Sequence, residues 1–155
     1  MRSREESIEI AAEPDAVFDL IHDYSKRLAW DPFLREARLL EGASSAAVGV
    51  KSICKARWAS GGMAMETVYV SLDRPSVAAV KMTRGPALLD EFAASLRQQA
   101  VGAGRTRVTY RFKLAARPRW LRFLLDPILF AIFARDVRIR LAALKRFLEV
   151  GSSER

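Results

Sequence analysis

The chain has 155 residues, of which 50% are hydrophobic and 28% are charged, and this composition is ordinary for one soluble globular domain. Its formal net charge is +8, but the arginines and lysines are scattered and form no dense basic run, which argues against nucleic acid as a partner. The single cysteine, Cys54, excludes an internal disulfide and a cysteine-rich metal site, and the longest apolar run is too short to cross a bilayer.

Location, domain limits and cofactors are predicted from the same features. The charged N-terminus, MRSREESIEI, lacks the apolar region of a signal peptide, so we expect a cytoplasmic protein. One domain should span residues 1–150, and residues 151–155, GSSER, should form a disordered tail. The sequence contains no glycine-rich phosphate loop, nucleophile elbow or metal-ligand cluster, and it therefore predicts neither a cofactor nor a metal site.

The N-terminal segment predicts one strand followed by two short helices. Residues 7–11 alternate apolar and polar side chains, which is typical of a half-buried strand. Pro14 suits the first turn of a helix, and Ser25 can cap a second helix that runs toward Trp30. That helix should end before Pro32, because the residue that precedes a proline disfavours helical geometry.

The middle of the chain has the period of two that predicts β-strands. The expected strands are 35–40, 48–59, 63–72, 77–83, 88–101 and 107–114. Gly61-Gly62 is a strong signal for a two-residue hairpin loop, which would place Trp58 opposite Met65 and Arg57 opposite Glu66.

Two further hairpins are predicted from turn residues. The segment 73–76 should place Tyr69 opposite Val80, and the segment 102–104 should place Leu96 opposite Tyr110. The strands therefore predict an antiparallel sheet with a polar outer face and an apolar inner face.

The last long segment, residues 118–150, predicts a helix with two apolar rows. The row that should hold the helix on the sheet consists of Val137, Leu141, Leu144 and Leu148. The row that should contact a ligand consists of Leu121, Leu125, Ile128 and Ile132. Asp126-Pro127 resembles a helix cap and first turn, so a kink or break is expected there.

The predicted order of elements is that of the helix-grip fold. The segment 8–34, IEIAAEPDAVFDLIHDYSKRLAWDPFL, resembles the opening of the polyketide cyclase/dehydrase and lipid-transport superfamily, also called START-like, Bet v 1-like or SRPBCC. The matching positions are Ile8, Ile10, Pro14, Val17, Phe18, Asp23, Trp30 and Pro32, and LAALKRFLE at 141–149 resembles the closing helix. The resemblance implies an α+β fold in which a curved, seven-stranded antiparallel sheet wraps around a long C-terminal helix, with two short helices after the first strand.

The inner face of the predicted sheet carries several small residues, among them Ala56, Thr67 and Ala94, which leave room under the terminal helix. One interpretation is an apolar ligand cavity, and the other is that Phe123, Phe130 and Phe133 fill the space. The candidate ligand-binding residues are Trp30, Cys54, Ala56, Trp58, Met65, Tyr69, Met82, Phe92, Ala94, Leu96, Tyr110, Phe112, Leu121, Leu125, Ile128 and Ile132.

Three functions fit this pattern, because members of the superfamily range from passive carriers to cyclases. The first is carriage of a small hydrophobic ligand such as a lipid, isoprenoid or polyketide. The second is a polyketide cyclase or dehydratase, in which Tyr69 or Tyr110 would polarise a carbonyl. The third is a membrane-docked quinone or lipid chaperone, since Arg119, Trp120 and Arg122 suit a membrane surface.

Two reactive side chains are predicted to have structural roles. His22 falls at the end of the first predicted helix, where the helix dipole would favour a cationic ring. Cys54 has no histidine near it in the sequence and should be a small buried hydrophobe.

Overall fold

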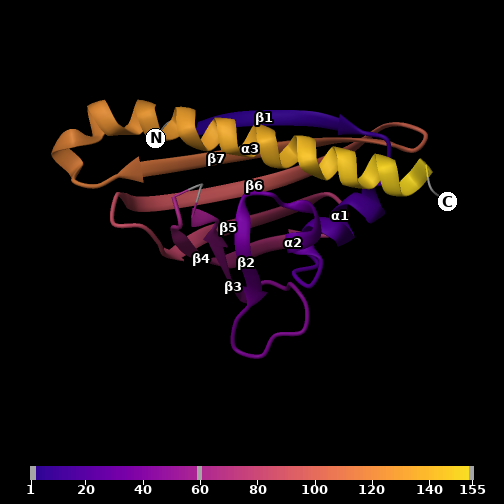
Figure 1. The fold of residues 1–155 in the computed structure, drawn as a ribbon, viewed down its shortest axis with the longest axis horizontal. Helices are drawn as coiled ribbons and strands as arrows, with labels where there is room; N and C mark the ends of the chain where they lie inside the picture. The colour runs from indigo at the N-terminus through magenta and orange to yellow at the C-terminus, as the bar shows by residue number, and fades with distance from the viewer. Residues whose placement is uncertain (1–2, 59–60, 154–155) are drawn as a thin grey trace.

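The computed structural model describes residues 3–58 and 61–153, which form one antiparallel sheet and a long helix (Figure 1). The strands are β1 (Ser3–Ile10), β2 (Leu34–Leu39), β3 (Lys51–Ala56), β4 (Ala64–Asp73), β5 (Val77–Arg84), β6 (Leu89–Gly102) and β7 (Arg105–Ala116). The helices are α1 (Pro14–His22), α2 (Arg27–Trp30) and α3 (Arg122–Ser153), and a 3₁₀ turn, η2 (Arg119–Leu121), precedes α3. The fold is the predicted α+β helix-grip fold.

The seven strands lie in the order β1-β7-β6-β5-β4-β3-β2, so every neighbouring pair except β1 and β7 is consecutive in the chain. The helix α3 runs along β1 and β7, and the remaining strands curl away beneath it (Figure 1). The helices α1 and α2 lie toward the end of the molecule where α3 finishes.

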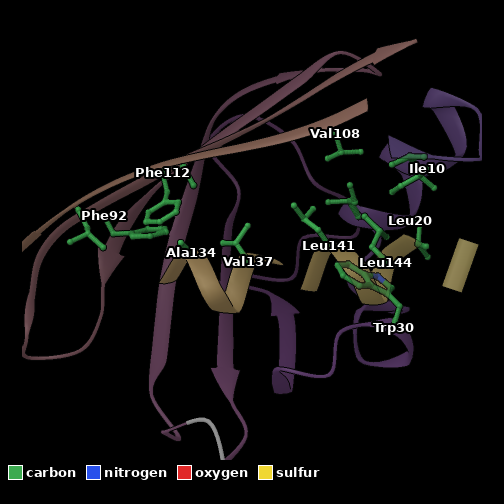
Figure 2. Packing of buried hydrophobic residues seen from close by; sticks show 14 of the residues in the cluster. Ile10, Leu20, Trp30, Phe92, Val108, Phe112, Ala134, Val137, Leu141 and Leu144 are labelled. Carbon is green, nitrogen blue, oxygen red and sulfur yellow. The ribbon is translucent and has the colours of Figure 1, made fainter. Parts of the chain in front are cut away.

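The core fills most of the layer between the sheet and α3. Phe130, Ala134, Val137, Leu141 and Leu144 recur at spacings of three and four, and all are buried. Figure 2 shows Phe92 and Phe112 at one end of this core, and Ile10, Leu20 and Trp30 at the other. Each large side chain that folding buries contributes roughly 1.5–3 kcal/mol. The row Val137, Leu141 and Leu144 therefore holds the helix on the sheet, as predicted.

Two of the three predicted hairpin registers are confirmed. Tyr69 pairs with Val80, and Leu96 pairs with Tyr110. The β4–β5 pair contains a register shift after Tyr69, and β6 continues to Gly102, so both loops differ by a residue from the predicted ones. These differences lie at the strand ends and leave the inward-facing residues unchanged.

The predicted register of the β3–β4 hairpin is wrong. Cys54 pairs with Met65, and Glu66 pairs with Ile53 rather than with Arg57. The backbone N–H of Ala56 donates to the carbonyl of Met63, and this hydrogen bond closes the hairpin. The loop between these two residues contains both glycines and is therefore longer than two residues. The displacement is four residues, an even number, so the same side chains still face inward. The expected end of this strand at residue 59 lies outside the described residues.

The predicted break in the terminal helix is absent, because α3 is continuous through Asp126 and Pro127. Pro127 stands close to the start of α3, where it removes a single intrahelical hydrogen bond. The Asp126 carboxylate does not cap the helix; it accepts a hydrogen bond of 2.8 Å from the backbone N–H of Ala116 at the end of β7.

Both predicted helix ends also need correction. Ser25 does not cap α2, since its hydroxyl and its backbone N–H both donate to the Asp23 carboxylate. The helix α3 continues to Ser153, so residues 151–153 are helical rather than part of a tail, and residues 154–155 lie outside the described ranges. No helix among the described residues combines the length and the apolar character needed to cross a membrane.

Candidate ligand-binding pocket

A cavity of about 160 Å³ lies between the inner face of the sheet and the middle of α3. Its walls include these residues predicted to bind a ligand: Cys54, Ala56, Met65, Tyr69, Phe92, Ala94, Leu96 and Tyr110. The α3 side is formed by Phe133, Asp136, Val137 and Arg140. The spacing of these four residues places them on one helical face, which is the face that also packs on the sheet.

The other predicted ligand-binding residues lie elsewhere. Trp30, Met82 and Phe112 belong to or pack against the hydrophobic core. Trp58 lies in the β3–β4 loop with its ring under the Arg35 guanidinium, 4.3 Å from the ring centroid, and its side chain is exposed. The row Leu121, Leu125, Ile128 and Ile132 does not line the cavity either, and Ile128 and Ile132 are exposed on the outer side of α3. The expected position of this row, facing the interior beneath the helix, is therefore not the one that the structure shows.

Aromatic side chains fill part of the space under α3 but not all of it. The Phe133 ring lies 5.3 Å from that of Phe92, and the Phe130 ring lies 5.6 Å from that of Phe112. Phe123 points away from the interior and is exposed. The remaining volume of about 160 Å³ is close to the roughly 150 Å³ of a cavity that holds a benzene-sized molecule.

A chain of hydrogen bonds forms one polar wall of the cavity. It joins the Nδ1 atom of His22 to the Tyr69 hydroxyl at 2.8 Å, and the Tyr69 hydroxyl to the Tyr24 hydroxyl at 3.2 Å. The chain continues from Tyr24 to Ser52 and from Ser52 to Thr67, each at 3.1 Å. The helix α1, the loop after it and the strands β3 and β4 thus meet at one polar cluster.

His22 does not have the predicted role of a cationic residue at a helix end. Burial, reinforced by the positive charge of Arg27, lowers the pKa of His22 from 6.5 to about 4. The ring is therefore neutral near pH 7, and its Nε2 atom is buried without a hydrogen-bond partner among the described residues. A neutral ring with one free nitrogen can donate to or accept from a ligand, depending on its tautomer.

We expect His22 to make the stability of the protein depend on pH. Because the unfolded chain protonates His22 near pH 6.5 and the folded chain only near pH 4, unfolding takes up a proton between these values. The contribution of His22 to the free energy of unfolding is therefore complete above pH 6.5. It is lost as the pH falls toward 4, and this loss is at most about 3 kcal/mol. Urea unfolding across this range should show a steeper loss of stability for the wild type than for His22→Gln. Parallel curves for the two proteins would refute the buried neutral histidine.

A second wall contains two arginines that share one carboxylate. The Oδ2 atom of Asp31 accepts from Arg27 Nε at 3.1 Å and from Arg140 Nε at 3.0 Å, and its Oδ1 atom accepts from the backbone N–H of Phe33. Asp31 has no exposed side-chain surface. Burial opposes its ionisation, but the attraction of Arg140 and Arg27 lowers the pKa of Asp31, so the group carries two positive charges and one negative charge.

Two further polar side chains of the cavity have no ion-pair or hydrogen-bond partner in the described part of the chain: the Tyr110 hydroxyl and the Asp136 carboxylate. Burial raises the pKa of Tyr110, which keeps the hydroxyl protonated and able to donate. Burial also raises the pKa of Asp136, although the nearby charge of Arg140 opposes that effect. The described residues contain no group of carboxylate, histidine or cysteine side chains that could hold a metal ion.

Sequence reasoning missed several of these polar residues. Arg27 and Asp31 lie four residues apart, and so do Asp136 and Arg140, which is a spacing that pairs charges on helices. This spacing could have indicated both pairs of charged residues from the sequence. No local pattern, however, indicates that Arg140 reaches Asp31, because the two are joined only by the packing of α3 on α2.

The architecture and the cavity define a helix-grip protein with an internal, largely apolar site. The family model for polyketide cyclase/dehydrase and lipid transport matches residues 1–149, so the chain belongs to this family. A search of curated proteins found no match.

Solved structures with the same fold have low sequence identity to this chain. They include the Zhui aromatase/cyclase from Streptomyces sp. R1128, at 18% identity and a TM-score of 0.78, with 96% of this chain and 93% of that chain covered. Another is major latex-like protein 151 from Panax ginseng, at 16% identity and a TM-score of 0.71, with 97% and 96% covered. The di-domain aromatase/cyclase StfQ of the steffimycin pathway has 16% identity and a TM-score of 0.79; 97% of this chain but only 52% of StfQ is covered, so this chain spans about half of that protein.

Proposed function

We propose that the protein binds and carries a small hydrophobic molecule that has one polar, oxygen-bearing end. The observation that carries this proposal is the division of the cavity into an apolar wall and a polar wall. Phe92, Ala94 and Leu96 form the apolar wall, while His22 and Tyr69 belong to the polar one. Ligand sites commonly combine a mostly apolar lining with a few placed polar groups.

Polar atoms of the cavity that have no hydrogen-bond partner within the described part of the chain support a ligand with a polar, oxygen-bearing end. The Nε2 atom of His22 is buried without a partner, and the Tyr110 hydroxyl has none among the described residues. A buried polar group without a hydrogen bond costs about 1–3 kcal/mol. A carbonyl or hydroxyl of a bound molecule would relieve this cost at His22, and the neutral state of His22 favours an uncharged group beside it.

The size of the cavity limits the part of the ligand that is enclosed. A volume of about 160 Å³ fits a single ring or a short alkyl segment. A larger isoprenoid, lipid or polyketide would have to extend beyond this volume or displace the Phe133 ring, which lines the cavity. The volume of the cavity therefore favours a small ligand, or a larger one that is only partly enclosed.

Photoaffinity labelling tests where such a ligand binds. A neutral alkyl ketone that carries a diazirine should label peptides that contain residues 92–96 and 133–137, with a stoichiometry of about one per chain. An excess of the same ketone without the diazirine should suppress this labelling. Labelling confined to exposed residues such as Trp58 and Trp120, or labelling that competitor does not suppress, would refute the proposal.

A second candidate function is that of a cyclase or dehydratase that uses the same cavity. Asp136 favours it, because a carboxyl group with a raised pKa that lies beside Arg140 can exchange protons with a bound ketone. Tyr110 lines the same cavity and would donate to the ketone oxygen. Incubation with a poly-β-ketone separates the two functions, since an enzyme releases a changed product and a carrier returns the ketone intact.

A further inference from the structure

The start of α3 lies at one end of the long axis of the molecule (Figure 1). An exposed patch of aromatic and basic residues surrounds it. The side chains of Trp120 and Phe123 are 74% and 79% exposed, which is unusual for large aromatic residues. We call this surface the α3 patch and define it by Leu88, Arg117, Arg119, Trp120, Phe123 and Leu124.

The backbone beneath the α3 patch is held by hydrogen bonds rather than loose. The N–H of Arg117 donates to the carbonyl of Leu88 at 2.8 Å, which joins the β5–β6 loop to the end of β7. Arg122 donates from Nε to the carbonyl of Ala116 at 2.8 Å and fixes the start of α3. Trp120 and Phe123 are three residues apart across this turn and therefore project from the same fixed support.

The α3 patch is positively charged. Asp90 accepts a hydrogen bond from Arg117 at 2.8 Å and another from Arg122, and Arg119 approaches the same carboxylate at 4.0 Å. One carboxylate thus faces three guanidinium groups, and the Arg119 side chain is 84% exposed. Exposed aromatic rings flanked by arginines match the amphipathic composition of proteins that bind at membrane surfaces.

We propose that the α3 patch docks on an anionic membrane surface, with Trp120 and Phe123 inserted at the depth of the lipid headgroups. Charge decides between this partner and a second copy of the chain. A symmetric dimer through the patch would bring Arg117 and Arg119 of one copy against the same residues of the other, and this like-charge contact is unfavourable. An anionic lipid surface has the opposite charge and also accepts the apolar rings.

Docking would place the cavity close to the bilayer. Pro86 lines the cavity, and Leu88, two residues further along the same loop, belongs to the α3 patch. A hydrophobic molecule would then pass between membrane and cavity over a short distance. The α3 patch would then be the surface through which the protein collects or delivers its ligand.

Vesicle sedimentation tests the docking. The full chain should sediment at low salt with vesicles of phosphatidylcholine and phosphatidylglycerol, and should not sediment with phosphatidylcholine alone. The double variant Trp120→Ser/Phe123→Ser should lower the partition coefficient about tenfold or more. Trp58→Ser is the matched control, because Trp58 is 77% exposed but lies in the β3–β4 loop, and it should bind like the wild type.

Three outcomes would overturn the docking proposal. The first is no binding to the anionic vesicles at low salt, and the second is an equal loss of binding in Trp58→Ser. The third is a dimer in sedimentation velocity that the double variant dissociates, since this would make the α3 patch a contact between copies. Ala94→Trp, which fills the cavity, should still bind vesicles like the wild type, so docking and ligand binding are tested separately.

Discussion

Replacing Asp31 with alanine should lower the free energy of unfolding by about 3–5 kcal/mol. Asp31 is fully buried and is the acceptor for both Arg27 and Arg140. Its removal leaves two guanidinium groups close together in a poorly hydrated site with no carboxylate to bind. The cost is that of uncompensated buried charge, which exceeds the cost of losing the hydrogen bonds alone.

Asp19→Ala is the matched control for this prediction. Asp19 also binds one arginine through both oxygens, at 2.7 and 2.9 Å from Arg74, but both side chains are more than half exposed. Removing an exposed pair costs about 0–1 kcal/mol because water replaces the lost partner. Urea unfolding of both variants measures the difference. Equal, small losses would show that the site of Asp31 is hydrated and that this group does not hold α2 against α3.

The fold was predictable because its local patterns agree with one another. Alternation in residues such as Tyr110 and Phe112 indicates the inner face of a strand, and spacings of three and four indicate the face of α3 that packs on it. The β3–β4 register was not predictable in the same way. Gly61 and Gly62 both have positive φ angles, as a tight turn requires, but they lie within a longer loop that closes at Ala56 and Met63.

The sheet side of the cavity was largely predictable, and the helix side was not. A period of two determines which strand residues face inward whatever the exact pairing, so Ala94 and Tyr110 were placed correctly. The first half of α3 has two apolar rows, and the sequence does not determine which row faces the sheet. Because Phe130 and Phe133 pack on Phe92 and Phe112, the row that contains Ile128 faces outward.

The polar walls depend on tertiary contacts that no local pattern records. His22 and Tyr69 are 47 residues apart in the sequence, and Asp31 and Arg140 are 109 apart. A helix-end histidine suggests a cation at a helix dipole, yet the fold buries the ring beside Arg27 and lowers its pKa instead. Burial therefore removes the positive charge that was predicted for this residue.

Filling the cavity should abolish ligand binding without unfolding the protein. Ala94 lies on β6 between Val80 and Phe112, and its methyl group faces the cavity. The indole of Ala94→Trp would occupy much of the about 160 Å³ that a ligand needs. We expect the affinity for a neutral fluorophore with a single aromatic ring to fall by about 100-fold or more, which corresponds to about 2.7 kcal/mol.

Equilibrium titration of this fluorophore into wild type, Ala94→Trp and Ala93→Trp tests whether a ligand occupies this cavity. Ala93 is the matched control, because it is adjacent on β6 but faces outward between Lys81 and Lys113. We expect saturable binding of about one fluorophore per chain to the wild type and to Ala93→Trp, and none to Ala94→Trp, with all three proteins folded by circular dichroism. Equal binding by all three proteins, or no binding by the wild type, would contradict the assignment of a ligand to this cavity.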